Sequence, residues 1–387
     1  MNVISARALG PIPVTRPYLG SEEEQAVVAA LRSGWITQGP RVAAFEQKFG
    51  EYVGCEHAIA VSSCTTALHL ALLAAGVKAG DEVICPSLSF IATANSIAYV
   101  GATPVFCDID LATYNLDPAR IEEIISPRTK AILVVHQIGL PAQMASVMAV
   151  AAKHSLIVIE DAACAVGSEY ESEIIGRPLG LMACFSFHPR KILTTGEGGM
   201  ITTNDANLAS RLRRLRQHAM SVSDMVRHTA KQVTTEAYDE IGFNFRMTDM
   251  QAAIGVVQLD RLSGFLERRR YLAKRYAASL EAIEWLQTPI VPPNCRHNFQ
   301  SYMVRLIDGS PAQRDAVMQE LLEKNISARR GIMPIHRERP YESDRWKETL
   351  IQTNRAADTT FILPLFHQMT EIEQDYVIES LFRVEAA

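Results

Sequence analysis

The sequence lacks any apolar run long enough to cross a bilayer, and its first ten residues contain no apolar stretch of the kind that forms a secretory leader. It also lacks a strong excess of either charge, because 38 Lys and Arg residues against 43 Asp and Glu residues give a formal net charge of −5. A weakly acidic chain argues against a surface for nucleic acids or anionic membranes. We therefore expect a cytoplasmic protein with neither kind of partner.

Cysteine is present, but in no pattern that forms a framework. The seven cysteines are odd in number and scattered, with no Cys-x-x-Cys pair. This excludes a disulfide scaffold and a zinc site of the usual spacing, so we expect reduced thiols and no bound metal. The chain also has no Walker A sequence, and Gly196-Glu-Gly-Gly199 lacks the spacing of a dinucleotide fingerprint. That absence disfavours a nicotinamide-dependent oxidoreductase on an otherwise similar sheet.

With 387 residues, 48% of them hydrophobic, the chain can build a large core divided between two domains. Short apolar runs alternate with helical patterns through the first half, which predicts an α/β fold with a mostly parallel, seven-stranded sheet and helices on both faces. The predicted strands are Ala58–Ser63, Glu82–Ser87, Pro104–Asp108, Ala131–His136, Leu156–Asp161, Ala183–His188 and Gly199–Thr203.

A long helical pattern from Met250 to about Leu280 predicts a helix that connects to a second domain. We predict a large domain over residues 1–250, with 1–13 as an irregular N-terminal arm. Residues 251–387 would then hold the connecting helix and a smaller α+β domain. Within it, the expected elements are a strand at Ser301–Leu306 and helices near Pro311–Lys324 and Glu371–Phe382.

Ligands of parallel sheets collect at the carboxyl ends of the strands. Four polar residues end predicted strands and are therefore expected to meet a ligand: Ser63, His136, Asp161 and His188. Lys191 follows one of these strands and precedes the glycine-rich turn. A desolvated lysine loses its proton readily and can form a Schiff base, although a lone lysine at a strand end can equally reach out to solvent.

Asp161 needs a partner, because a carboxylate at the edge of a core is costly unless a cation or hydrogen-bond donor meets it. That partner could be an arginine or a helix N-terminus. Taken with Lys191, the protonated pyridine nitrogen of pyridoxal phosphate also fits, since a Schiff-base lysine and a pyridinium-facing aspartate are typical of that cofactor.

Two further segments suit the same cofactor. Residues 61–72 read as a strand, a small polar turn and a helix, whose N-terminal hydroxyls and amides could bind a phosphate or could form an ordinary N-cap. Phe90, after a predicted strand end, could stack on the pyridine ring or belong to the core.

In combination, these features resemble the DegT–StrS type of sugar aminotransferases, within the aspartate-aminotransferase superfamily of pyridoxal-phosphate enzymes. The resemblance runs from about Pro13 to the end. The matching motifs are Ser33-Gly-Trp-Ile-Thr-Gln-Gly-Pro40, Ser62–Leu72, Ser89-Phe-Ile-Ala-Thr-Ala-Asn95, Glu160-Asp-Ala-Ala163, Ser186–Gly199 and Gly242-Phe-Asn-Phe-Arg-Met-Thr-Asp249.

The resemblance implies that pyridoxal phosphate is bound as a covalent aldimine to Lys191, with Asp161 on the pyridine nitrogen and Phe90 on the ring. Cys64, Thr65 and Ser186 match phosphate-binding positions.

The resemblance also implies that Asn244 reaches the phosphate of the neighbouring subunit of a homodimer with shared active sites. Trp35, Thr37 and His336 match the sugar pocket, and His188 could touch the substrate or be satisfied locally.

One position departs from the pattern. Cys164 stands beside the expected site of the cofactor's 3-hydroxyl, where many relatives carry Gln or His, and a thiol is a poor hydrogen-bonding substitute.

The implied reaction is a two-stage transamination, in which L-glutamate converts the cofactor to pyridoxamine phosphate. The amine then passes to a keto sugar carried on a nucleotide diphosphate. Two alternatives stay open: a keto-cyclitol acceptor, as in aminoglycoside-type pathways, and a regulatory protein that binds the cofactor without turnover.

Overall fold

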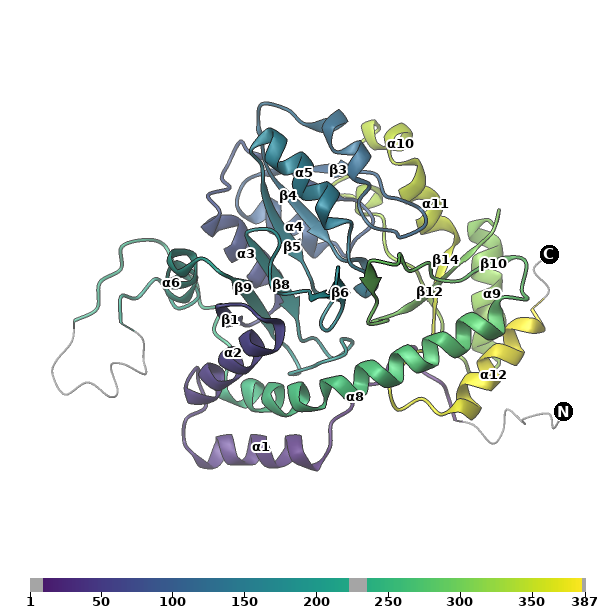
Figure 1. Ribbon diagram of the computed structural model, residues 1–387, viewed down its shortest axis with the longest axis horizontal. Coiled ribbons are helices and arrows are strands. Elements are labelled where there is room, and N and C mark those ends of the chain that lie inside the picture. The colour runs from purple at the N-terminus through teal and green to yellow at the C-terminus, as the bar shows by residue number, and fades with distance from the viewer. Residues whose placement is uncertain (1–9, 223–234, 385–387) are drawn as a thin grey trace.

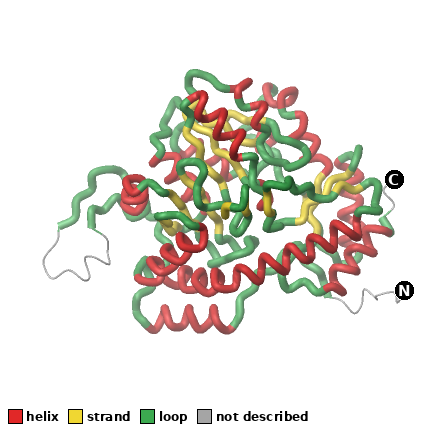
Figure 2. Tube along the Cα trace, viewed as in Figure 1, coloured by secondary structure: helices red, strands yellow, loops and turns green. Residues whose placement is uncertain are grey.

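The computed structural model describes residues 10–222 and 235–384 (Figures 1 and 2). Most of the expected N-terminal arm, residues 1–9, lies outside the described residues. Within the described chain, no helix is both long and apolar enough to span a membrane.

The centre of the molecule is a seven-stranded sheet in the order β1-β9-β8-β5-β4-β2-β3. β9 is antiparallel to both of its neighbours, and the remaining pairs are parallel. The predicted mostly parallel sheet is therefore confirmed. Its strands are β1 (His57–Val61), β2 (Glu82–Pro86), β3 (Thr103–Cys107), β4 (Thr129–Val135), β5 (Ile157–Asp161), β8 (Met182–Ser186) and β9 (Gly199–Thr203).

Helices cover both faces of this sheet, as predicted. The connection β2–α4–β3 runs toward one edge, whereas β4–α5–β5 runs toward the other, so right-handed crossovers place α4 (Ala92–Tyr99) and α5 (Met144–His154) on opposite faces. Figure 1 shows α5 in front of the strands and α3 (Cys64–Ala74) with α4 behind them. The other helices of this part are α1 (Ser21–Arg32), α2 (Pro40–Val53) and α6 (Ala206–Leu215).

The C-terminal part forms an antiparallel sheet in the order β10-β12-β14-β13, and a small sheet, β11-β6-β7, lies beside the large one. The strands are β6 (Glu169–Tyr170), β7 (Glu173–Ile174), β10 (Leu286–Gln287), β11 (Cys295–Arg296), β12 (Tyr302–Leu306), β13 (Arg329–Arg330) and β14 (Thr360–Leu363). The helices are α9 (Pro311–Glu323), α10 (Arg345–Thr349), α11 (Ile351–Thr359) and α12 (Glu371–Phe382).

One helix, α8 (Asp249–Leu280), connects the two parts and runs along the bottom of Figure 1. Its first half contributes Leu259 and Leu262 to the hydrophobic core around the large sheet, and its second half contributes Leu272 and Tyr276 to the core of the small sheet. The helix therefore belongs to both cores. The division of the chain at residue 250 remains a prediction.

The topology of the large sheet brings the carboxyl ends of its parallel strands to one edge. In the large sheet every strand except β9 points its carboxyl end toward the same edge, and β9 begins there at Gly199. Gly199 is paired with Val61 on one side and Ser186 on the other. A Cβ at Gly199 would lie 2.5 Å from the Ser63 carbonyl and 2.7 Å from the Cys64 amide nitrogen. Only glycine lets the N-terminus of α3 approach the sheet this closely.

We expect Gly199→Ala to destabilise the protein by about 1–3 kcal/mol, because the new methyl group meets backbone atoms that have no room to move. Gly264→Ala is the matched control: its Cβ meets nothing within 4 Å, and alanine in the middle of α8 should stabilise by about 0.5–1 kcal/mol. Chemical denaturation measures both. Equal stability of the two variants would contradict the close approach.

Candidate active site

Lys191 lies in the turn after β8, at the carboxyl edge of the large sheet. Its amide donates to the His188 carbonyl at 2.8 Å, and the amide of Ile192 donates to the Gln300 side chain at 3.0 Å. Its amine donates to the Cys164 sulfur at 3.0 Å. The alternative of a lysine that reaches out from a strand end is therefore wrong, because the amine ends on a sulfur inside the protein.

The pKa of Lys191 depends on this sulfur. Burial favours the neutral amine and lowers the pKa, but the charge and hydrogen bond of Cys164, with smaller effects of Cys64 and Asp161, reverse the shift. The net result is a pKa above the ordinary value. Our expectation that a buried Lys191 would lose its proton readily is therefore wrong here, because the neighbouring groups, Cys164 above all, favour the ammonium.

Asp161 is the last residue of β5, next to β8 in the sheet. One carboxylate oxygen accepts from the Ala163 amide at 3.1 Å, and the other accepts from the Thr93 hydroxyl at 3.1 Å. Burial nevertheless raises the pKa of Asp161, and the Ala163 amide, the charge of Lys191 and Thr93 lower it by less. Asp161 and Lys191 thus lie close enough for each to act on the pKa of the other.

The N-terminus of α3 forms another wall. Ser63 is its N-cap: the Ser63 side chain accepts from the Thr66 amide at 3.2 Å, and Thr66 Oγ1 accepts from the Ser63 amide at 3.1 Å. The following amides, of Cys64 and Thr65, lie in the first turn, where no intrahelical acceptor exists. Burial raises the pKa of the Cys64 thiol, and Asp161 adds to the effect, so this thiol stays neutral.

Phe90 is 69% exposed, although it lies directly beyond the buried end of β2. Our alternative of a core phenylalanine is therefore wrong. The backbone of Phe90 is linked to Asp161 through Thr93, whose amide donates to the Phe90 carbonyl at 3.0 Å and whose hydroxyl donates to the Asp161 carboxylate at 3.1 Å.

His136 does not meet a ligand site, contrary to our expectation for polar residues at strand ends. Its side chain is completely buried, with Nε2 3.1 Å from Glu160 and Nδ1 accepting from the Ala142 amide at 3.1 Å. Because both ring nitrogens of His136 already have partners within the protein, the side chain has a structural role. His188, in contrast, is partly exposed, and its Nε2 lies 3.9 Å from Glu197. Burial lowers the pKa of His188, and Glu197 offsets part of the shift.

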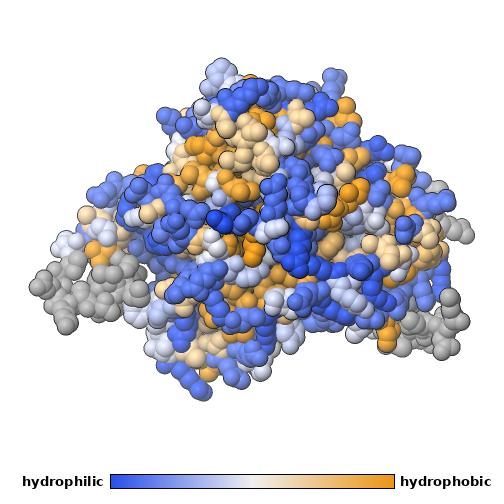
Figure 3. All heavy atoms as spheres, viewed as in Figure 1, coloured by the Kyte–Doolittle hydropathy of each residue, from blue (hydrophilic) through white to orange (hydrophobic). Residues whose placement is uncertain are grey.

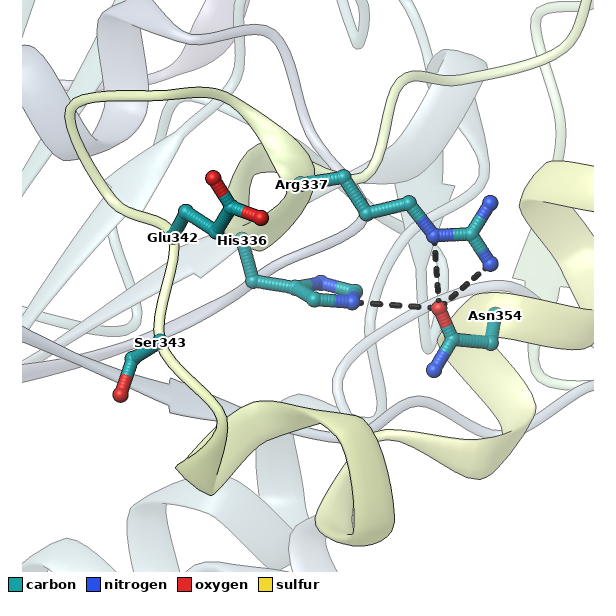
Figure 4. A pocket seen from close by; sticks show the side chains of 5 residues that line it. All are labelled: His336, Arg337, Glu342, Ser343 and Asn354. Atoms are coloured by element: carbon teal, nitrogen blue, oxygen red, sulfur yellow. Dashed lines mark hydrogen bonds between the residues drawn. The ribbon is translucent and has the colours of Figure 1, made fainter.

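His336 is also buried, at 4% exposure. Its Nδ1 is 2.8 Å from the Ser87 hydroxyl, and its Nε2 is 3.1 Å from the Asn354 side-chain oxygen. With Asn354, Arg337, Glu342 and Ser343 it lines a cavity of about 450 Å³ (Figure 4). In this close-up the His336 ring and the Arg337 guanidinium both point to Asn354.

The remaining predicted residues lie in three separate segments of the chain. Trp35 is partly buried and donates from Nε1 to the Gln38 carbonyl at 3.1 Å, while the Thr37 carbonyl accepts from the Asp249 amide at 3.1 Å. Asn244 is exposed and forms an isolated β-bridge with Gln217. Ser186 ends β8 beside Gly199.

Sequence reasoning missed two arginines. Arg190 immediately precedes Lys191, and Arg329 lies on β13 of the small sheet. Burial lowers the pKa of Arg329, and the charge of Arg190 lowers it further, so the two guanidinium groups lie near each other. In residues 10–222 and 235–384 neither forms an ion pair with a carboxylate. No periodic pattern marks such a pair, because one residue lies in the turn after β8 and the other in β13 of the small sheet.

The residues that the structure describes contain no group of three or more His, Cys, Asp or Glu side chains arranged to hold a metal ion.

Comparison with known sequences assigns the family. A model of the DegT/DnrJ/EryC1/StrS aminotransferase family matches residues 17–382. The chain belongs to this family.

Similar proteins agree with that assignment. The chain is 42% identical over 375 residues to the GDP-perosamine synthase of Caulobacter vibrioides, covering 96% of this chain and 98% of the relative. It is 40% identical to the spore coat polysaccharide biosynthesis protein SpsC of Bacillus subtilis, with 96% of each chain covered.

Solved structures share the fold. An aminotransferase, TlmJ from Streptoalloteichus hindustanus, is 35% identical, covers 96% of this chain and 97% of its own, and superposes with a TM-score of 0.88. The sugar aminotransferase Spr1654 of Streptococcus pneumoniae, described there as putative, has PMP-form and PLP-form structures, each 27% identical with a TM-score of 0.89. They cover 96% of this chain and 98% and 97% of their own.

The raised pKa of Asp161 predicts how pH changes stability. A group whose folded pKa lies above its unfolded value stabilises at low pH, and this contribution is lost as pH rises through the folded pKa. In the cofactor-free protein, Asp161→Asn should therefore be more stable than wild type at pH 8, by about 2 °C in Tm, and less so at pH 5. Asparagine can keep both contacts, accepting from Ala163 and donating to the Thr93 oxygen.

Thermal denaturation across this pH range measures the difference. Asp308→Asn is the control, since Asp308 is exposed and pairs with Arg355 at the surface. An Asp161→Asn advantage that does not grow with pH would show that burial does not disfavour the carboxylate.

Proposed function

We propose that this protein is a pyridoxal-phosphate aminotransferase that moves an amino group from L-glutamate to a keto sugar carried on a nucleotide diphosphate. The observation that carries the proposal is the nearness of Lys191 and Asp161 at the carboxyl edge of the sheet. Membership of an aminotransferase family fixes the reaction class. The donor, the nucleotide and the subunit arrangement are proposals.

The residues present fit the cofactor. Asp161 is a buried carboxylate whose raised pKa shows that its charge is only partly compensated, so a protonated ring nitrogen suits it. Phe90 offers an exposed ring after the end of β2. The amides of Cys64 and Thr65, at the start of α3, suit a phosphate, and the hydroxyl of Ser186 lies in the neighbouring strand.

When bound, pyridoxal phosphate supplies an aldehyde that condenses with amines and a ring that accepts electrons from the substrate carbon. The protein's own contribution is position and proton transfer. Lys191 would hold and move the proton at its Nζ, while Asp161 would keep the ring nitrogen protonated through its carboxylate. Phe90 would stack on the pyridine ring of the cofactor and hold its plane, and the amides at the start of α3 would bind the phosphate of the cofactor.

Two features support an anionic, nucleotide-linked acceptor. Arg190, which precedes Lys191 in the sequence, and Arg329 place two positive charges near each other, without a carboxylate partner in the described chain. A diphosphate would compensate both charges, because guanidinium groups bind phosphate oxygens well. The relative from Caulobacter vibrioides is a GDP-perosamine synthase, which is consistent with such an acceptor. These features favour the nucleotide-linked sugar over the keto-cyclitol.

The segment around Asn244 supports a homodimer with shared sites. Ile241 is 86% exposed and Tyr238 is 59% exposed, which is unusual for large apolar side chains. On the face drawn in Figure 3, hydrophobic residues form separate patches among hydrophilic ones. A second copy that covers this segment would bury its apolar side chains and bring Asn244 to the partner's phosphate.

The reaction itself is tested with the loaded enzyme, glutamate and a panel of keto acceptors, monitored by mass spectrometry. We expect 2-oxoglutarate with glutamate alone, and an amino product with nucleotide-linked keto sugars but not with keto-cyclitols. Lys191→Ala should lower the rate by at least ~10²-fold, because the proton carrier is lost. Lys153→Ala, which removes a surface lysine paired with Glu122, is the control. Cofactor binding without 2-oxoglutarate formation would favour the regulatory alternative.

The shared site is tested by complementation. In a mixed dimer of Lys191→Ala and Asn244→Ala subunits, one site carries both substitutions and the other carries neither. If Asn244 acts on its neighbour, refolding equal amounts of the two weak variants together should restore about a quarter of wild-type activity by statistical pairing. If Asn244 acts within its own subunit, each site of the mixed dimer stays damaged, and the mixture is no more active than its parts.

A further inference from the structure

Cys164 is the only hydrogen-bond partner of the Lys191 amine in the described chain, at 3.0 Å from Nζ to Sγ. The main chain holds both residues in place. The Cys164 carbonyl accepts from the Asn298 side chain at 2.8 Å, and the same Asn298 nitrogen donates to Val166 at 2.9 Å. The turn that holds Lys191 is fixed by the hydrogen bond from the Lys191 amide to the His188 carbonyl. The contact is therefore set by the fold on both sides.

The other titratable groups that face Lys191 do not compete for this role. The Cys64 thiol is kept neutral by burial, which raises its pKa. The Asp161 carboxylate already accepts from Ala163 and Thr93. His188 accepts from the Arg190 amide through Nδ1 at 3.1 Å, and burial, with the charge of Lys191, lowers its pKa. The sulfur of Cys164 is left as the group that can exchange a proton with Nζ directly.

The thiol of Cys164 can do what the side-chain amide of glutamine cannot do at this position. A glutamine side chain can accept a hydrogen bond from an ammonium but cannot take its proton, whereas a thiolate can do both. A charge-assisted bond between ammonium and thiolate also compensates the lysine charge inside the pocket.

We infer that Cys164 and Lys191 form a proton couple whenever the lysine amine is free, in which a thiolate–ammonium pair converts to thiol and neutral amine when the lysine must act as a base. The proton moves from Nζ to Sγ, no electrons are transferred, and the pair keeps its total charge. The catalytic use of the free amine rests on the proposed aminotransferase function, whereas the pair itself does not.

The other six cysteines should not obscure Cys164 in a measurement of thiolate absorbance. Burial raises the pKa of all six, to about 11 for Cys55 and Cys295 and upward also for Cys64, Cys85, Cys107 and Cys184. Near neutral pH these thiols contribute almost no thiolate. The thiolate absorbance of the full chain, freed of cofactor, should therefore report on Cys164 when pH is varied between 5 and 9.

We expect thiolate absorbance to rise within this pH range. Cys164→Ser should remove this transition. Lys191→Met should move it upward by at least ~1 unit, because the cation that stabilises the thiolate is lost. Cys55→Ser is the control and should leave the transition unchanged. A transition that survives Cys164→Ser, or that Lys191→Met does not move, overturns the inference.

The second measurement uses the loaded enzyme and glutamate alone. Cys164→Ser, whose hydroxyl cannot take the proton near neutral pH, should lower kcat about tenfold and leave KM within about twofold, with a changed pH profile. Cys164→Gln should do the same. Wild-type kcat and pH profile in either variant overturn the catalytic role even if the thiolate is present. A wild-type protein that shows the thiolate but converts no glutamate refutes the proposed function and leaves the pair intact.

Discussion

The arrangement depends on placing two ionisable groups of opposite charge type, Lys191 and Asp161, near each other at the edge of a hydrophobic sheet. Burial disfavours the charged form of each, since it raises the pKa of Asp161 and acts against the ammonium of Lys191. Neighbouring parallel strands solve the problem, because β5 and β8 end side by side and deliver both groups to one pocket. The order of strands in the sheet therefore determines that the two groups lie near each other.

The first half of the fold was readable from the sequence for a clear physical reason. Strands buried on both faces are continuous apolar runs, and each predicted run corresponds to an observed strand within two residues at either end. The helix Glu371–Phe382 was predicted with its observed bounds, because Thr370 and Glu373 form a capping box that is visible in the sequence. Lys191 and Asp161 followed from the same pattern, since polar residues at the ends of such runs stand out.

What could not be predicted depends on contacts between distant segments. His136 ends an apolar run as Asp161 does, yet it is satisfied by Glu160 and the Ala142 amide, and nothing local distinguishes the two cases. The contact from Cys164 to Lys191 and the nearness of Arg190 to Arg329 join separate strands and sheets. The short strands β6, β7 and β13 have two residues each, too few to show a period.

The helix α8 contributes side chains to the core of each sheet, and this has a consequence for how the molecule comes apart. Loss of the small sheet would expose the apolar face of the second half of α8 and fray a helix whose first half still supports the large sheet. The stabilities of the two cores are therefore coupled through α8, which is one continuous helix. Cooperative melting of both parts in a single step follows from this shared element, even though each has a sheet of its own.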